Sequence, residues 1–311
     1  MNAEQAVRLA AKNKTIIPAL NIPYLPMMEP VIRAVRDENS FAIIEVARLE
    51  WEKFESKSPE AVAEEYFKYR DPEHTLLHLD HVPVIDEDGL AVDYLPIIER
   101  AIKAGYQSVM IDASRLPLAE NIRATAAVAE LAYKAGIPVE AELGAIAGHE
   151  EGGIGMSYEE LFLSKKGFTG IEDARRFAKE SGCAWLSVSA GSIHGAIAKG
   201  IRGEQKPEAR LDIDHIAALY AATGGMPLVL HGGSGIRQEY LLRAVQNGIA
   251  KINIGTEIRQ PYEAALDEKH KKHEKPVTME NVREKVYRKT RWVLRDFLKA
   301  SNTKPLIGKE Q

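Results

Sequence analysis

The feature that most constrains the fold is a regular alternation of short apolar runs with longer helical patterns along the 311 residues. Turn or polar residues follow each apolar run, as is typical of buried parallel strands. The predicted strands are Thr15–Asn21, Phe41–Ala47, Thr75–Asp80, Ser108–Asp112, Pro138–Leu143, Trp185–Ala190, Pro227–His231 and Ala250–Ile254. Alternating β and α elements predict a barrel or a doubly wound sheet, and eight units favour a (β/α)8 TIM barrel.

Helical patterns separate the strands from the third onward and extend beyond both ends of the barrel. The predicted helices between strands are Leu95–Ala104, Ala119–Ala135, Ile171–Ser181, Ile213–Ala222 and Glu239–Asn247. An amphipathic helix is expected within residues 1–15, and the charged C-terminal tail is expected to be helical with a break at Lys275–Pro276. Because no linker or repeat interrupts the pattern, residues 1–311 are expected to form a single barrel domain with extra N- and C-terminal helices.

Composition narrows the class of protein further. The net charge of −4 and pI of about 6.2 lack the basic bias of a nucleic-acid binder. The N-terminus has no apolar core of a secretory signal, and no apolar run approaches the roughly 20 residues that span a bilayer. We therefore expect a cytoplasmic protein without nucleic-acid or membrane partners. Cys183 is the sole cysteine, which excludes an intrachain disulfide and predicts a small buried core residue rather than a reactive thiol.

Polar residues suited to chemistry gather at the ends of the predicted strands. They are Asn21, His78, Asp80, His81, Asp112, Glu140, Glu142, His194, His231 and Asn253. The C-terminal ends of barrel strands carry the active site, so this placement predicts a catalytic rim.

Three histidines of this set predict a metal site: His81 in HLDHV, His194 in GSIHG and His231 in LHGGSG. Imidazole is a common zinc ligand, and a catalytic site has three protein ligands and an open position. Each histidine alone could be a hydrogen-bonded core residue. His78, three residues before His81, would lie on the opposite face of a regular strand. The weaker candidates are His74, His215, His270 and His273.

Glycine-rich segments follow three of the strands. HGGSG, before a helix expected to start near Ile236, and NIGTE occupy the places where barrels commonly bind phosphate. The acidic segment GHEEGGIGMS, residues 148–157, suits a mobile loop over the site, although an exposed turn is the alternative. The charge run EKHKKHEK is interpreted as a solvated helix face or loop, with an oligomer contact as the alternative.

Together these motifs resemble those of the class II, metal-dependent ketose-bisphosphate aldolases, the family of fructose- and tagatose-bisphosphate aldolases. The matching stretches are LHLDH, SVMIDAS with the following ENI, VEAELGAIAGHEE, GSIHG, LHGGSGI and KINIGTE. They follow family order from about Asn21 to Glu257 and cover most of the chain.

The resemblance implies a metal centre. His81, His194 and His231 would bind Zn²⁺. Asp112 and Glu142 would stand behind these ligands or serve as alternative ligands, with a second divalent site as an option. Ligand type alone also admits Co²⁺ or Mn²⁺.

The resemblance also implies the proton and substrate groups. Asp80 would exchange a proton with the C4 hydroxyl, Glu150 would handle the proton at C3 of the enediolate, and Asn253 would lie close to that enediolate. A monovalent cation, Na⁺ or K⁺, would sit near the phosphate, and a homodimer or homotetramer is expected. The pocket for dihydroxyacetone phosphate would be lined by Asn21, Gly195, Gly232, Gly233, Ser234, Asn253, Gly255 and Thr256.

The chemistry is consistent with this reading. Carbon–carbon cleavage leaves negative charge on an enediolate, which a Lewis-acid metal stabilises, and a carboxylate beside the metal can deprotonate the alcohol. The other aldolase solution is a Schiff-base lysine. Lys251 is the only lysine inside a predicted strand, and we interpret it as a structural or rim residue because the metal already supplies the electron sink.

The chain departs from the family pattern where substrate is recognised. Glu45 and Ala47 stand where the family usually has glutamine and serine, with Arg48 next, and only Lys199 follows GSIHG where tyrosine and lysine are usual. The reaction type is therefore better supported than the choice between a fructose- and a tagatose-type substrate. Distal phosphate or carboxylate could be bound by Arg48, Arg115 or Arg259, each of which could equally form a surface ion pair.

Two other functions remain open from the residues alone. A metal-dependent sugar epimerase or isomerase on the same scaffold would share the ligands but release no three-carbon product. A non-catalytic aldolase partner subunit would have no need of Asp80, Glu150 and the three histidines, and their presence argues against it.

Overall fold

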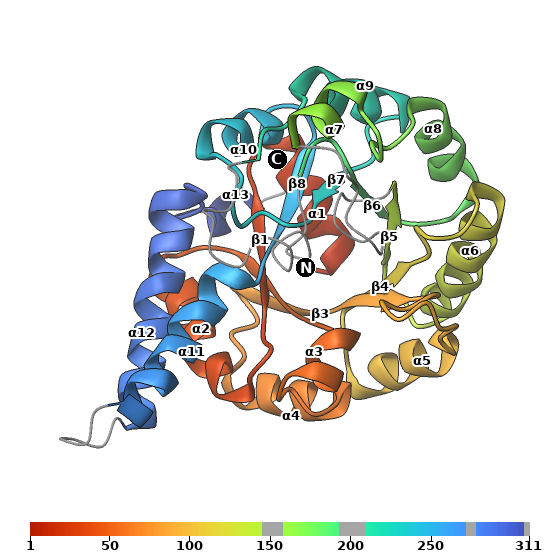
Figure 1. The fold of residues 1–311 in the computed structure, drawn as a ribbon. Coiled ribbons are helices and arrows are strands. Elements are labelled where there is room, and N and C mark those ends of the chain that lie inside the picture. Colours follow the sequence, from red (N-terminus) through yellow and green to blue (C-terminus); the bar gives the residue numbers. More distant parts are fainter. Residues whose placement is uncertain (145–157, 193–208, 272–277, 308–311) are drawn as a thin grey trace.

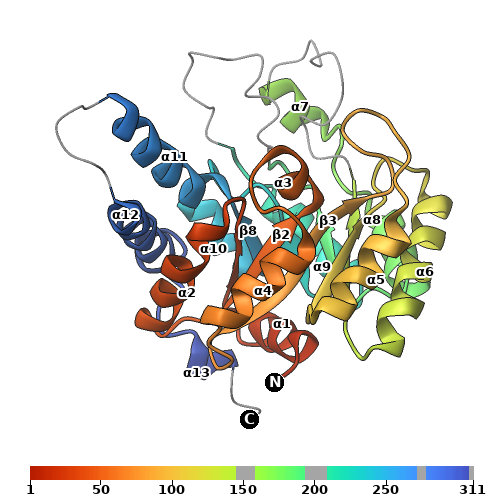
Figure 2. The ribbon, with the colours of Figure 1, turned by 90° about the horizontal axis from the view of Figure 1, so that it is seen from below.

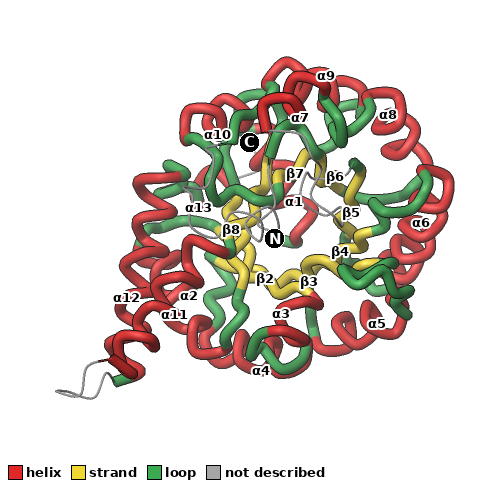
Figure 3. The backbone as a smooth tube through the Cα atoms, in the orientation of Figure 1, coloured by secondary structure: helices red, strands yellow, loops and turns green. Residues whose placement is uncertain are grey.

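The computed structural model describes residues 1–144, 158–192, 209–271 and 278–307. Eight parallel strands close into a barrel in chain order, with β1 paired to both β2 and β8, as Figures 1 and 3 show. The strands are β1 (Ile17–Asn21), β2 (Ala42–Ala47), β3 (Thr75–Pro83), β4 (Ser108–Asp112), β5 (Val139–Leu143), β6 (Trp185–Val188), β7 (Leu228–Leu230) and β8 (Ile249–Ile254). The predicted (β/α)8 barrel is confirmed.

Helices surround the strand ring (Figure 1). They are α2 (Met28–Asp37), α3 (Arg48–Lys53), α4 (Pro59–Tyr69), α5 (Tyr94–Ala104), α6 (Leu118–Lys134), α7 (Tyr158–Ser164), α8 (Ile171–Glu180), α9 (Ile213–Ala222), α10 (Gln238–Val245) and α11 (Thr256–Lys271). The helix after HGGSG begins at Gln238, between the predicted starts near Ile236 and at Glu239, because Arg237 still has extended backbone and serves as the N-cap.

The N-terminal helix α1 (Ala3–Lys12) closes the bottom of the barrel, the end opposite the C-terminal rim (Figure 2). Asn2 caps it through a reciprocal capping box with Gln5. The apolar face of α1 joins a cluster with side chains from several strands. The main members of this cluster are Ala3, Ala6, Val7, Ala10, Ile17, Ala19, Phe41, Ile43, Leu76, Trp185 and Val229. The amphipathic pattern at the start of the chain is therefore explained by the packing of the apolar face of α1 against the bottom of the barrel.

The strands are buried on both faces. Alternate residues such as Leu77 and Leu79 of β3 belong to a second, larger apolar cluster, which joins the strands to the surrounding helices. Leu76, one residue before Leu77, belongs instead to the cluster that α1 closes. Because side chains alternate along a strand, two apolar faces produce the nearly continuous apolar runs of the sequence.

Farther along the strands, the side chains that point into the barrel are polar rather than apolar. Glu45, His78, Glu140 and Lys251 are fully buried inside the barrel. Two residues further along β3, β5 and β8, toward the C-terminal rim, lie Asp80, Glu142 and Asn253. His231 directly follows β7 at the same rim. The fold thus brings charged groups from separate strands to one end of one barrel.

The described parts of the C-terminal segment are helical, as predicted, and the predicted break at Lys275–Pro276 lies outside the described residues. Helices α11 and α12 (Met279–Trp292) pack beside α2 on one flank of the barrel (Figure 1), and a π-helical segment η3 (Val293–Phe297) continues α12. The remaining short elements are the 3-10 turn η1 (Leu25–Met27) and α13 (Lys304–Ile307), which contacts α1. Among the described residues, no helix combines the length and apolar character that crossing a bilayer requires.

Candidate active site

A β-bulge in β3 brings two consecutive residues, Asp80 and His81, to the same side of the strand. The pairing of β3 with β4 shifts register between Leu79 and Val82, and His81 adopts a positive φ of 21°. In a regular strand successive side chains point to opposite faces, and a bulge with its extra residue breaks this rule. The expectation that His78 and His81 lie on opposite faces is therefore wrong, because the strand does not stay regular between them.

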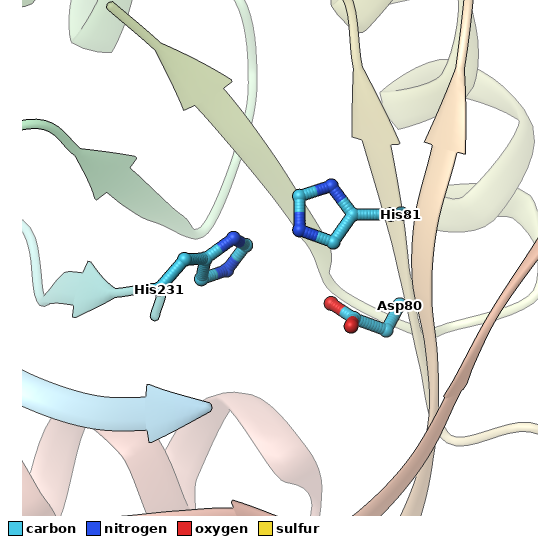
Figure 4. Close-up of side chains that lie close together, drawn as sticks. All are labelled: Asp80, His81 and His231. Carbon is cyan, nitrogen blue, oxygen red and sulfur yellow. The ribbon is translucent and has the colours of Figure 1, made fainter. Parts of the chain in front are cut away.

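His81 and His231 face each other across the mouth of the barrel, with Asp80 beside them, as Figure 4 shows. The two imidazole rings have centroids 4.5 Å apart at an interplanar angle of 68°. Candidate ligand atoms of Asp80, His81 and His231 all lie within 4.8 Å of one another. The structure thus brings together two of the three histidines predicted as metal ligands, although β3 and β7 are distant in sequence.

Two carboxylates line the same space from β4 and β5. His81 Nδ1 lies 3.2 Å from Asp112 Oδ2 and 3.9 Å from Glu142 Oε2, and His231 Nδ1 lies 3.2 Å from Glu142 Oε2. Burial opposes protonation of His81, but the negative charge of Asp80 and the contact with Asp112 outweigh it and raise the histidine pKa well above its usual value. The site therefore has a strongly negative potential suited to a cation.

The donor set fits a divalent metal. Glu142 Oε2 is buried and accepts no hydrogen bond from any residue that the structure describes, although two imidazoles lie near it. Uncompensated burial of a carboxylate oxygen is costly, and a coordinated cation would remove that cost. Imidazole and carboxylate groups within 4.8 Å of one another, as in the group of His81, Asp112 and Glu142, are typical of such sites.

Glu140 holds the ring of His231 from the side away from this space. His231 Nε2 donates a hydrogen bond of 2.8 Å to Glu140 Oε1, which leaves Nδ1 directed toward Glu142. A carboxylate that accepts the second ring N–H of a metal-binding histidine fixes its tautomer and orientation. Sequence reasoning placed Glu140 at the strand end without giving it a role. The signal was its spacing of two from Glu142, which puts both on the inner face of β5.

A buried ammonium group lies beneath the histidines. Lys251 Nζ lies 3.1 Å from Glu45 Oε2 and 3.0 Å from Glu140 Oε2, and it donates a 2.7 Å hydrogen bond to Asn253 Oδ1. Burial alone would lower the pKa of Lys251, but Glu140 and Glu45 raise it above its usual value. Lys251 therefore lies inside the barrel rather than at the rim, and its charge is paired with Glu45 and Glu140.

Glu45 and Glu140 both lie next to Lys251, but their pKa values are shifted in opposite directions. Glu140 also accepts a 2.6 Å hydrogen bond from Trp185 Nε1, and despite burial the Lys251 charge holds its pKa well below the usual range. Glu45 accepts no hydrogen bond among the described residues, and burial together with the charge of Asp80 raises its pKa well above the usual value. The family glutamine position thus holds a carboxyl group that depends on Lys251.

Asp80 is held by two amides. Its Oδ2 accepts a hydrogen bond from Asn21 Nδ2 and its Oδ1 one from Asn253 Nδ2, each 3.0 Å long. Burial disfavours the charged form, but His81, Lys251 and other neighbouring cations outweigh it and lower the Asp80 pKa to about 2. Asp80 is therefore an ionised, oriented carboxylate, and β1, β3 and β8 together fix its position.

The two glycine-rich segments lie side by side at the ends of β7 and β8. Gly233 N–H donates to the carbonyl of Asn253 over 3.3 Å, and a Cβ on Gly233 would meet Ile252 Cδ1 at 2.7 Å. The segment around Gly233 thereby lies against the end of β8, which Gly255 and the start of α11 at Thr256 follow directly in the chain. The N–H of Gly233 itself is engaged in holding the two segments together.

Glu50 is a residue of the site that sequence reasoning did not identify. It lies on α3, its Oε2 accepts the N–H of Ala47 at 2.9 Å, and its carboxyl group hydrogen-bonds with the side chain of Asn21. Burial, with the nearby charge of Asp80, raises its pKa to about 8. The sequence signal was its position three residues after the altered serine position.

Other predicted residues lie elsewhere or outside the description. His194, Gly195, Glu150 and the loop of residues 148–157 lie outside the described residues, as do Lys199 and His273. Two of the weaker histidines have local partners: His74 lies 3.0 Å from Asp71, and His215 Nε2 lies 2.8 Å from the carbonyl of Thr169.

The three candidate arginines contact acidic or carbonyl groups of the protein. Arg48 lies 2.8 Å from Glu52 and 3.8 Å from Asp86, and Arg259 lies 2.6 Å from Glu263. Arg115 donates to the backbone carbonyl of Asp86.

The chain is thus a (β/α)8 barrel whose C-terminal mouth carries histidines and carboxylates in candidate metal-binding clusters. Residues 1–302 match the family model described as fructose-bisphosphate aldolase class-II, and the chain belongs to this family. It is 38% identical over 192 residues to a fructose-bisphosphate aldolase of Streptococcus pyogenes, covering 62% of this chain and 56% of that protein.

Two further similar proteins are aldolases with other names. The chain is 36% identical over 182 residues to a 6-phospho-5-dehydro-2-deoxy-D-gluconate aldolase of Shouchella clausii, covering 58% of this chain and 53% of that protein. The matches thus span little more than half the length of these curated relatives. The solved structure of the YdjI aldolase from Escherichia coli K12 superimposes with a TM-score of 0.75 at 25% identity, covering 96% of this chain and 97% of that one.

Proposed function

We propose that this protein is a metal-dependent aldolase that reversibly cleaves a phosphorylated ketose, of the fructose or tagatose 1,6-bisphosphate type, into dihydroxyacetone phosphate and an aldehyde. The observation that carries the proposal is the position of Asp80, an ionised carboxylate fixed by two amides beside His81 and His231. Membership of the class II fructose-bisphosphate aldolase family supports the same reaction type.

The metal would be held by His81 and His231, with His194 as third ligand and Zn²⁺ as the first candidate. Asp112 and Glu142 would stand behind these ligands or hold a second divalent cation. When bound, the cation would supply Lewis-acid stabilisation of the negative charge that develops on cleavage. Glu140 would keep His231 oriented, because it already accepts the hydrogen bond of the other ring nitrogen.

Asp80 would take the proton from the C4 hydroxyl during cleavage and return it during synthesis. Its low pKa means that it is ionised at neutral pH, as a group that accepts a proton must be. The amides of Asn21 and Asn253 would keep its oxygens in place. Glu150 would handle the proton at C3.

The three-carbon fragment would be bound between the ends of β7 and β8. Gly232, Ser234, Gly255 and Thr256 would face its phosphate together with Gly195, and Gly233 would tie the two segments together. The N-terminus of α11, a helix of 16 residues that begins at Thr256, would add favourable dipoles toward an anion. Na⁺ or K⁺ near the phosphate, a homodimer or homotetramer, and a cytoplasmic location belong to the same proposal.

A Schiff-base mechanism is disfavoured by the setting of Lys251. A lysine nucleophile must lose its proton, whereas Lys251 is clamped between Glu45 and Glu140 with a raised pKa.

The test is release of dihydroxyacetone phosphate from a panel of phosphorylated ketoses, with EDTA and with Zn²⁺ added back. We expect one sugar to yield the triose phosphate, EDTA to abolish release and Zn²⁺ to restore it. Asp80→Ala and Asp80→Asn should each lose roughly 10²- to 10⁴-fold in kcat, the usual contribution of a general acid–base group. Asp88→Ala, an exposed aspartate after the same strand, is the matched control and should keep full activity.

Protein that carries stoichiometric metal yet releases no triose phosphate from any sugar would contradict the proposal. Interconversion of the sugars without triose release would instead identify an epimerase or isomerase. Equal activity of Asp80→Asn and the parent protein would remove Asp80 from the mechanism.

A further inference from the structure

A second carboxyl group, that of Glu50, lies beside the proposed proton carrier Asp80. Helix α3 begins directly at the end of β2, and Glu50 folds back so that its Oε2 accepts the N–H of Ala47 at 2.9 Å. Its carboxyl group also hydrogen-bonds with the side chain of Asn21, whose Nδ2 donates to Asp80 Oδ2 at 3.0 Å. One amide group therefore connects the carboxyl groups of Glu50 and Asp80.

Burial of the Glu50 carboxyl group at this position is energetically unfavourable, and a residue that only capped helix α3 would not require it. Glu50 is partly buried next to the negative Asp80, and burial of a carboxyl group without full hydrogen bonding is unfavourable. A serine or aspartate at position 47 could cap α3 directly, whereas Ala47 cannot. The neighbouring Glu52 on the same helix lies 2.8 Å from Arg48 with 38% of its side chain exposed, so an acidic residue of α3 can be placed at the surface.

The carboxyl group of Glu50 has hydrogen-bonding positions that its two partners do not occupy. A protonated carboxyl group offers one O–H donor together with acceptor positions on its oxygens. The described residues that hydrogen-bond to Glu50 supply two donors, the N–H of Ala47 and the amide of Asn21. A bound group that donates an O–H would occupy a remaining position, whereas a methyl group would leave the carboxyl both desolvated and unpaired.

We infer that Glu50 is a specificity-determining residue whose carboxyl group binds a hydroxyl of the aldehyde fragment, next to the oxygen that Asp80 serves. The ligand class is a hydroxyaldehyde rather than an unsubstituted aldehyde of the same length. This inference rests on the proposed aldolase function and adds the recognition of one substrate end. Glu50 would do this in a chain where Ala47 replaces the serine usual in the family.

The test is aldol synthesis from dihydroxyacetone phosphate and three aldehydes of equal chain length: propanal, 2-hydroxypropanal and 3-hydroxypropanal. The measurement is kcat/KM for each aldehyde, with saturating dihydroxyacetone phosphate and Zn²⁺, in the parent protein and in Glu50→Ala, Glu50→Asp and Glu50→Gln. Glu52→Ala on the same helix is the matched control. The decisive quantity is the ratio of kcat/KM for the better hydroxyaldehyde to that for propanal, because general damage to the enzyme cancels in it.

We expect the parent protein and Glu52→Ala to prefer a hydroxyaldehyde roughly 2- to 10-fold, the range for a hydrogen bond between neutral groups. Glu50→Ala should lower this ratio nearly to one with an unchanged KM for dihydroxyacetone phosphate. Glu50→Asp, which withdraws the carboxyl group by one methylene, should lower it as well, and Glu50→Gln should keep most of it. If Glu50→Ala does not fold, the Asp and Gln variants decide.

An unchanged ratio in Glu50→Ala and Glu50→Asp would overturn the inference while leaving the aldolase function intact. A parent protein that prefers propanal would overturn it too. Failure of the parent protein to condense any aldehyde, together with failure to release triose phosphate in the reverse reaction, would instead count against the proposed function itself.

Discussion

Replacement of Lys251 by methionine tests whether the buried charges beneath the site form one interdependent unit. The ammonium group lies 3.1 Å from Glu45 and 3.0 Å from Glu140, and all three side chains are fully buried. Lys251→Met keeps most of the apolar volume but removes the positive charge. Two carboxyl groups then remain in the barrel with no cation between them.

The expected loss of stability follows from this geometry. Breaking a buried ion pair by removing one partner costs about 3–5 kcal/mol, because the remaining charge is left uncompensated. Here Glu140 keeps hydrogen bonds from Trp185 and His231, whereas Glu45, whose pKa is already raised, accepts none among the described residues and would be left as an unpaired buried carboxyl group. The double variant Glu45→Gln/Lys251→Met should therefore recover part of the loss.

The assay is equilibrium urea unfolding of the parent protein, both single variants and the double variant, with EDTA present so that metal binding does not contribute. Lys134→Met is the matched control, because Lys134 forms a 2.9 Å pair with Glu130 at a surface where 69% of its side chain is exposed. It should change the free energy of unfolding by less than about 0.5 kcal/mol. A loss below about 1 kcal/mol in Lys251→Met, or no recovery in the double variant, would refute the reasoning.

Two further predictions concern Lys251 and Cys183. Borohydride added during turnover should neither inactivate the protein nor label Lys251, because that ammonium stays protonated between two carboxyl groups; a reduced adduct found by mass spectrometry would contradict this. Burial raises the Cys183 pKa to about 11. The folded state therefore binds this proton more tightly than the unfolded state. The resulting stabilisation is full below the thiol's unfolded pKa of about 8.5 and is lost as pH rises through 11. The fall in unfolding free energy between pH 8 and 11 should be smaller in Cys183→Ala than in the parent protein, and equal slopes would disprove it.

Much of the barrel could be predicted because its signals are local. The strand Ser108–Asp112 has the predicted limits, and the others differ by a few residues at their ends. Apolar runs bounded by turn residues follow from strands that are buried on two faces, which is a property of each segment by itself. The placement of Asp80, His81 and His231 at one mouth then follows, because all barrel strands point the same way.

What the sequence could not reveal depends on register and on contacts between distant strands. A bulge of one residue in β3 turns the side chain of His81 to the same side as that of Asp80. No feature of the sequence HLDHV predicts this bulge. The burial of Lys251 between Glu45 and Glu140 depends on the pairing of β8, β1 and β2 and on the width of the closed barrel.

The sequence by itself determined the order of strands and helices, the polar rim and the chemical types of its residues, because periodicity and strand ends are encoded within each segment. Only the tertiary structure decided which carboxyl groups share a lysine, which of them orients His231, and that Glu50 reaches Asn21 beside Asp80. Charges act over a few ångströms of space regardless of separation in the chain, so their pairing and their pKa values exist only once the barrel is closed.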